Sequence, residues 1–224
     1  MTPTDLNDPG DAGSCLDAIH GYVTTISLNL QHPVVGRELV DACSMHSRII
    51  DATTGISSGL RVLYALPTRD QLTIRAGQPI LTAHLPAGYA AAITHRPWFP
   101  PTKAGLYRMV GVVNPGRSSR TGGPTRNQPD RKKRNDSPRL YPVTETGEWL
   151  ARRLAAATVV EHRITRTWTT RGTHRTGRTI TARCVAIAAI VDVHDSDVVA
   201  TAVTGGIGID RTWGCGLTLW EPLT

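Results

Sequence analysis

The chain has 224 residues, enough for one large domain or two small ones. Its net charge of +7 lies in its second half, because residues 1–116 carry 8 basic and 8 acidic side chains and residues 117–224 carry 17 and 10, so we expect a polyanion partner or a basic solvated surface there. No apolar run reaches the length of a membrane span, and the four cysteines form no C-x-x-C pair, which argues against a transmembrane protein, a zinc site and a disulfide framework.

Residues 1–20 are polar and contain four aspartates but no lysine or arginine. This composition is typical of a flexible N-terminal extension and unlike a signal or transit peptide. We therefore expect a cytoplasmic protein.

Residues 21–115 alternate between strand and helix patterns. Alternating apolar positions predict strands over 22–30, 60–66, 71–76 and 105–113, and helical spacing predicts helices over 36–53 and 87–94. The order β-α-β-β-α-β predicts a ferredoxin-like domain.

Residues 116–138 are rich in glycine, proline, serine and arginine and have no periodicity, which predicts a basic, flexible linker. The linker ends near a run of four cations that are candidate phosphate contacts or part of a disordered, solubilising loop. This run is Arg131, Lys132, Lys133 and Arg134.

Residues 139–224 repeat the first pattern. We expect strands over 140–143, 159–170, 178–193 and 217–221, with helices over 144–158 and 195–203. Residues 171–177 form the tip of a hairpin between the two long strands. The sequence thus predicts an α+β protein of two tandem ferredoxin-like (RRM-like) domains.

The stretch "GGIGIDRTWGCGL" is a C-terminal glycine-rich loop. It lacks a third glycine in the G-x-G-x-x-G pattern, and it runs from helix to strand, whereas dinucleotide and P-loop motifs run from strand to helix. A structural turn and a backbone cradle for RNA remain open, since glycine permits close approach and positive φ. The glycines concerned are Gly205, Gly206, Gly208, Gly214 and Gly216.

This loop resembles the C-terminal motif of the CRISPR RNA-processing endoribonucleases of type I-E systems, the CasE family. "GYVTTISLNL", "LVDACSMHSRI", "LRVLYAL", "LYRMVGVVNPGRS" and "GEWLARRLAAATVVEHRI" resemble further family segments in the same order. The resemblance covers about residues 21–222. It implies metal-independent cleavage of precursor CRISPR RNA at the base of the repeat stem-loop, leaving a 2′,3′-cyclic phosphate and a 5′-OH, with no cofactor.

The resemblance also implies partners: the repeat hairpin and the other subunits of the Cascade complex near the 3′ end of the CRISPR RNA, with no membrane association. Two rival hypotheses stay open. One is a catalytically weak or inactive Cascade subunit that only holds the hairpin, and the other is a ferredoxin-like RNA-binding protein outside CRISPR.

The resemblance implies that His46 is catalytic. The helical pattern alone leaves a histidine at the edge of a core as the alternative, because Leu39, Cys43 and Ile50 share its face. The tyrosine that some family members carry three residues earlier is replaced by Cys43, and no lysine or serine helper follows. We therefore expect a stabilising cation from elsewhere, with Arg37 and Arg48 as candidates.

Basic residues gather on the predicted hairpin, where the resemblance implies a grip on the RNA stem. Several arginines suit an A-form stem, which is recognised through its shape and phosphates; a solvated strand edge protected by charge is the alternative. The candidate RNA-binding residues are Arg163, Arg166, Arg171, His174, Arg175 and Arg178, with Arg211 of the glycine-rich loop as a further phosphate contact.

Overall fold

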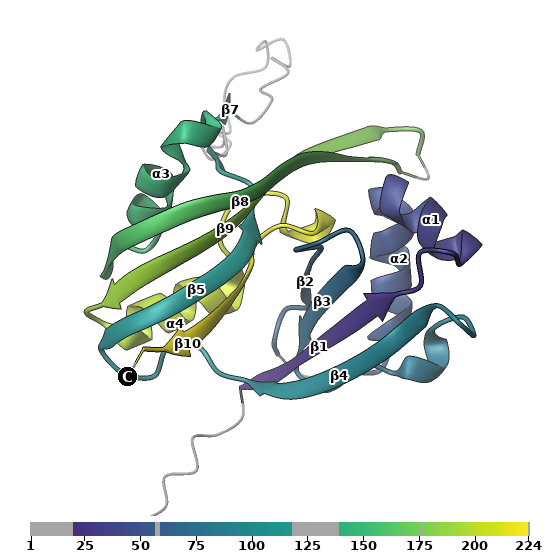
Figure 1. Ribbon diagram of the computed structural model, residues 1–224, viewed down its shortest axis with the longest axis horizontal. Coiled ribbons are helices and arrows are strands. Elements are labelled where there is room, and N and C mark those ends of the chain that lie inside the picture. Colours follow the sequence, from purple (N-terminus) through teal and green to yellow (C-terminus); the bar gives the residue numbers. More distant parts are fainter. Residues whose placement is uncertain (1–19, 57–58, 118–138, 175, 224) are drawn as a thin grey trace, which may run out of the picture.

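The computed structural model describes residues 20–56, 59–117, 139–174 and 176–223. They form two four-stranded antiparallel sheets that lie side by side (Figure 1). In each sheet the first and third strands of the β-α-β-β-α-β path are central, so the tandem ferredoxin-like prediction is confirmed.

The first sheet has the strand order β2-β3-β1-β4. Two helices pack on it through one apolar cluster, and a 3₁₀ turn, η1, replaces the second helix of the ferredoxin-like path. The bounds are β1 Gly21–Leu28, α1 Pro33–Val40, α2 Ala42–Ala52, β2 Leu63–Ala65, β3 Gln71–Ala76, η1 Thr82–His84 and β4 Ala90–Trp98.

The second sheet has the order β10-β5-β9-β8, and its two helices, α3 and α4, bury their apolar sides against it. A two-stranded ladder, β6 with β7, flanks residues 118–138. The bounds are β5 Gly105–Val113, β6 Gly116–Arg117, β7 Arg139–Leu140, η2 Val143–Glu145, α3 Thr146–Arg153, β8 Ala157–Thr173, β9 Thr179–Val193, α4 Ser196–Gly205, η3 Arg211–Trp213 and β10 Leu217–Pro222.

One predicted element of the first half is wrong, and one predicted strand belongs to the other sheet. Residues 87–94 were expected to be helical because of their alanines, but residues 90–98 form β4, which pairs along its length with β1. Residues 105–113 form a strand as expected, yet β5 pairs with β9 and β10 of the second sheet. The first sheet is therefore complete at Trp98, and β5, not residues 140–143, is the first strand of the second unit.

The helix expected over 36–53 is broken at Asp41. Asp41 ends α1 and begins α2, where its carboxylate accepts hydrogen bonds from the Cys43 backbone N–H at 3.1 Å and the Ser44 hydroxyl at 2.6 Å. A side chain that accepts from the first turn is the usual N-cap. Because of this break, the helix that carries His46 begins at Ala42 with its own N-cap.

The two halves meet through an apolar cluster between the sheets, which includes Leu63 of β2 and Val112 of β5. Cys184 and Cys215 belong to this cluster as free thiols whose sulfurs lie 3.3 Å apart. The buried guanidinium of Arg75 on β3 adds polar contacts, which are considered in the Discussion.

Candidate active site

His46 lies in the second turn of α2, where the second half of the chain covers the helix. Its imidazole stacks near-parallel to the ring of Tyr64 on β2 at 6.5 Å, and meets the edge of Trp213 in η3 at 5.2 Å. η3 belongs to the glycine-rich loop. The loop and the histidine, far apart in the sequence, therefore form one site.

One imidazole borders two open pockets. The larger, the His46 pocket, has a volume of about 690 Å³ and lies between α2, η3 and the β8–β9 hairpin. The smaller, the Arg61 pocket, has about 290 Å³ and carries Arg61 and Arg211 on its wall. The lining of the His46 pocket is Cys43, His46, Ser47, Ile50, Asp51, His174, Thr212 and Trp213.

Partial burial sets the protonation of His46. Loss of solvent lowers the pKa of His46 below its ordinary 6.5, because the charged imidazolium is disfavoured there. The neutral ring, which accepts a proton, therefore predominates at neutral pH. Among the described residues the buried hydroxyl of Tyr64 has no hydrogen-bond partner, and burial raises the pKa of Tyr64. The contact between Tyr64 and His46 is therefore one between their rings.

The two cations proposed from the sequence do not line either pocket. Arg48 donates from Nε to the buried carboxylate of Glu38 at 3.0 Å, and Tyr89 donates its hydroxyl to the other oxygen of Glu38. Arg37 is exposed on α1. The wall of the Arg61 pocket instead presents Arg61 and Arg211 to the space beside His46.

Arg211 is partly occupied by its own loop. Its Nη1 donates to the carbonyl oxygens of Gly205 at 2.8 Å and Gly206 at 3.3 Å. Burial, followed by repulsion from Arg61 and Arg153, lowers the pKa of Arg211. Arg61, Arg153 and Arg211 therefore lie near one another, and among the described residues no acidic side chain lines the Arg61 pocket, which favours binding of an anion.

The glycines of the loop make room for protein atoms. A side chain at Gly208 would lie 2.8 Å from the carbonyl oxygen of Asn114, and one at Gly214 would lie 3.0 Å from the ring of Tyr64. Both glycines also have positive φ, which side chains disfavour. The structure thus gives the glycines a packing role, whereas their predicted backbone contact with RNA stays a prediction.

The β8–β9 hairpin forms as predicted and reaches over α1 and α2 (Figure 1). A bulge at Thr165 inserts one extra residue into β8. Ile164, before the bulge, packs on the core beneath α3 and α4. Arg166 and Trp168, after it, turn to the opposite face of the sheet, toward β2. Arg166 therefore points into the space between the halves.

The remaining candidate residues divide into two groups. Arg163, Arg171 and Arg178 are exposed on the hairpin, and His174 lines the His46 pocket. Arg175 and the run from Arg131 to Arg134 lie outside the described residues. The roles of all these residues in RNA binding stay predictions.

Sequence reasoning missed Tyr64, Arg61 and Trp213. Tyr64 reads as an ordinary apolar position of a strand, and Trp213 as part of a turn. Only the register of β2 and the path of the glycine-rich loop bring them to His46. The one sequence signal for Trp213 was its position as the single aromatic residue of the glycine-rich loop.

The described ranges contain no group of three or more metal-ligating side chains. Within the same ranges no helix is long and apolar enough to cross a membrane.

A family model described as "CRISPR associated protein" matches residues 22–222. No curated protein matches the sequence. Among solved structures, Cse3 of Thermus thermophilus, bound to an RNA representing a pre-cleavage complex, is 19% identical with a TM-score of 0.72 over 91% of this chain and 100% of that one. Cas6e from Escherichia coli K-12 is 17% identical, with a TM-score of 0.59 and 90% and 100% coverage. A chain of a CRISPR RNA-guided surveillance complex is 21% identical, with the same TM-score and coverage. At such identities the likeness establishes the fold.

Proposed function

The chain belongs to the family of CRISPR-associated proteins, and we propose that it is the endoribonuclease that cleaves precursor CRISPR RNA at the base of the repeat stem-loop. Two structures with the same fold are described as Cse3 bound to RNA and as a CRISPR RNA-guided surveillance complex. In this proposal the protein keeps the cleaved hairpin and joins the Cascade complex in the cytoplasm.

The observation that carries the proposal is the position of His46. Its imidazole, neutral at neutral pH, lines a pocket together with Arg61 and Arg211, and it lies close to the β8–β9 hairpin with its arginines. RNA needs this combination for cleavage by its own 2′-OH: a base near neutral pH and positive charge around the phosphate.

His46 acts as the general base. It takes the proton of the ribose 2′-OH as that oxygen forms a bond to the adjacent phosphorus. The bond from phosphorus to the 5′ oxygen breaks, and this oxygen takes a proton from water as it leaves. The products are a 2′,3′-cyclic phosphate and a 5′-OH, and no metal takes part.

Arg61 and Arg211 stabilise the extra negative charge of the phosphorane. In this proposal they take the place of the lysine or serine helpers that some family members carry farther along the helix, near the positions of Asp51 and Thr54 in this chain. Because donors aimed at developing charge contribute on the order of 10²–10³ in rate, even partly screened arginines matter.

The test is incubation of the protein with the repeat hairpin in EDTA, with an unrelated stem of equal length as the control. We expect cleavage of the repeat at one position and products ending in a cyclic phosphate and a free 5′-OH. Cleavage that requires a divalent ion, or products with a 5′-phosphate, would contradict the mechanism.

A second function is favoured by one observation. The carboxylate of Asp51 lines the His46 pocket and repels phosphate, and Cys43 offers no tyrosine hydroxyl. A subunit that only holds the hairpin is therefore the alternative. It predicts tight binding of the repeat hairpin and no cleavage under any condition.

A further inference from the structure

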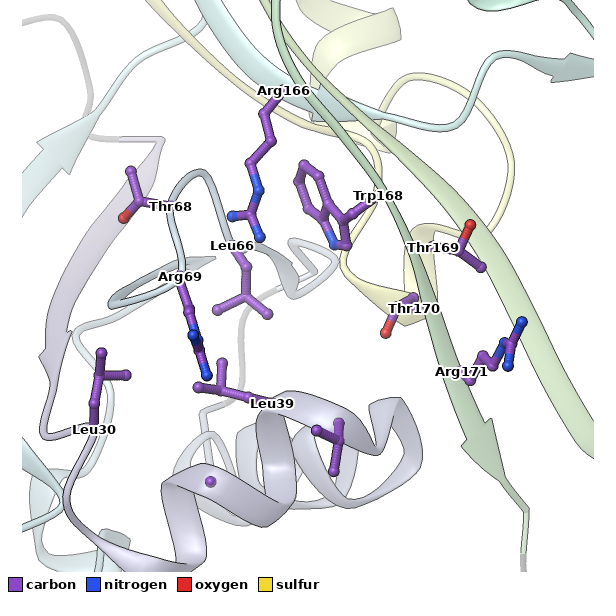
Figure 2. A pocket seen from close by; sticks show the side chains of 12 residues that line it. Leu30, Leu39, Leu66, Thr68, Arg69, Arg166, Trp168, Thr169, Thr170 and Arg171 are labelled. Atoms are coloured by element: carbon purple, nitrogen blue, oxygen red, sulfur yellow. The ribbon is translucent and has the colours of Figure 1, made fainter.

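A third hollow, the α1 groove, lies between α1, the β2–β3 turn and β8 (Figure 2). Its volume is about 460 Å³. Its floor is apolar, formed by Leu30, Leu39, Val40 and Leu66. The floor is partly open to solvent, since Leu30 and Val40 are 44% and 74% exposed. None of the described residues that line it is acidic.

Cations border this apolar floor from two elements. Arg69 extends from the turn toward Leu39 and Arg166 extends from β8 toward Leu66, so that both enter the same space (Figure 2). Arg171 lies farther along β8, with its side chain turned away from the groove (Figure 2). Within the described part of the chain none of these three arginines pairs with a carboxylate. The groove therefore presents positive charge that the protein itself does not neutralise.

Trp168 adds a flat surface to the groove. The guanidinium of Arg166 lies over its ring, 4.4 Å from the ring centre. The Thr165 bulge turns both side chains into the groove. Aromatic and guanidinium planes beside an open basic groove are the features that bind unpaired nucleotides, whose bases stack while their phosphates meet arginine.

We infer that the α1 groove binds an unpaired RNA strand that flanks the repeat hairpin, with phosphates on Arg69 and Arg166 and a base on the apolar floor. This inference rests on the proposed function. A duplex would leave the floor uncovered, because its bases are stacked inside and it offers mainly phosphates and sugar edges.

The groove is placed to receive a strand from the active site. Along β8, the chain at Arg171 borders the groove, Gly172 packs against Cys43 of α2, and His174 lines the His46 pocket. The close contact at Gly172 has no space for a side chain, since one would lie 2.8 Å from the Cys43 nitrogen. The two hollows are therefore neighbours along β8, separated by this contact, and in our inference the RNA strand passes over it.

The experiment measures binding of RNA that cannot be cleaved because it carries 2′-deoxy nucleotides at the base of the stem. The probes are the bare repeat hairpin and the same hairpin with an unpaired 5′ or 3′ flank. The variants are Arg69→Ala and Arg166→Ala. The matched control is Arg108→Ala, which removes an exposed arginine from β5 on the far side of β9.

We expect one flank to tighten binding to the unchanged protein. Arg69→Ala should weaken binding of that flanked hairpin on the order of tenfold and leave the bare hairpin unchanged. The slope of log affinity against log salt should fall by about 0.7 for the lost phosphate contact. Arg69 is exposed in a turn, so its substitution is expected to leave the fold intact, and Arg69→Glu provides a stronger second variant.

Three results overturn the inference. Equal losses for bare and flanked hairpins would place the stem in the groove, and unchanged binding of every probe would point to a protein segment paired with the edge of β8. A wild-type protein that binds the bare hairpin but gains nothing from either flank would also overturn it. If the wild type does not prefer the repeat hairpin to an unrelated stem, the proposed function itself fails.

Discussion

The imidazole of His46 is held by two aromatic rings that come from distant parts of the chain, Tyr64 and Trp213. Burial lowers its pKa, and Arg61 and Arg211 lie on the wall of the pocket beside it. For single residues, the resemblance implied that His46 is catalytic, and we expected Arg37 or Arg48 to supply the positive charge that stabilises the phosphate. Arg48 is engaged by buried Glu38, a contact that the sequence did not reveal.

The lowered pKa of His46 gives a prediction for pH. A base must be neutral, so the rate of cleavage should rise with pH and level off once the imidazole is deprotonated. Because burial lowers the pKa of His46, the midpoint should lie below the ordinary 6.5. Single-turnover rates at subsaturating protein concentration measure the free protein's value. A midpoint above 6.5, or a rate that falls with pH, would contradict a base of this kind.

The carboxylate of Asp51 gives a second prediction. It is exposed and lines the His46 pocket, where the proposed function puts the scissile phosphate. Asp51→Asn should raise the single-turnover rate a few-fold, since removal of a like charge near a partly exposed site is worth about 1 kcal/mol. Asp51→Lys should raise it further. The control Asp197→Asn, exposed on α4, should change nothing, and an unchanged or slower Asp51→Asn protein would argue against phosphate binding in this pocket.

Among the elements, α2 and the β8–β9 hairpin determine the site together. Asp41 caps α2 and also accepts a backbone hydrogen bond from Thr173 of β8, so one carboxylate fixes both elements. The break at Asp41 and the bulge at Thr165 depend on tertiary contacts, and periodicity therefore predicted neither. The bulge decides which arginines of the hairpin face the first half.

Asp41→Ala tests this coupling. Loss of the N-cap should lower the free energy of unfolding by about 1 kcal/mol and slow cleavage, because the hairpin loses its attachment to α2. Asp195→Ala is the matched control: it removes an N-cap of the same kind from α4, away from His46. Both variants should lose similar stability in denaturant titrations, but Asp195→Ala should cleave normally. Equal effects on cleavage would show that Asp41 acts through general stability alone.

Across the whole molecule, the two halves are joined by Arg75, which is fully buried and forms no ion pair with a carboxylate of the described residues. Its guanidinium donates to the carbonyl oxygens of Val203 and Thr204 at the C-terminal end of α4, and to that of Arg61, and it lies 4.5 Å from the ring centre of Trp98. Burial lowers the pKa of Arg75 to about 10, so it stays charged at neutral pH. It fixes α4, and with it the loop that carries Trp213, against the first sheet.

Arg75→Met should therefore destabilise the protein by about 2–4 kcal/mol, since several buried carbonyl groups lose their donor. Arg75→Lys keeps the positive charge but not the planar array of donors, so it should recover only part of the stability that Arg75→Met loses. Arg108→Ala, on the surface of β5, is the control and should cost little. Denaturant unfolding measures all three. A loss below about 0.5 kcal/mol for Arg75→Met would show that the carbonyl groups find other partners.

The sequence predicted the repeated β-α-β-β-α-β order because alternation and helical spacing are local. It placed 105–113 in the wrong sheet because pairing between distant strands has no local signal. Residues 87–94 were misassigned since alanine favours helix, whereas pairing with β1 decides the outcome in β4. For the same reason the glycine-rich loop was recognised as a motif, but its contact with His46 was not.

The central claim is that His46 performs the chemistry and does not merely pack at the edge of a core. The most direct test is single-turnover cleavage of the repeat hairpin in EDTA by the wild-type protein and by His46→Ala, with hairpin affinity measured in parallel. We expect the substitution to slow cleavage at least about 10²-fold and to leave affinity and folding unchanged. Cleavage at the wild-type rate by His46→Ala would contradict this account.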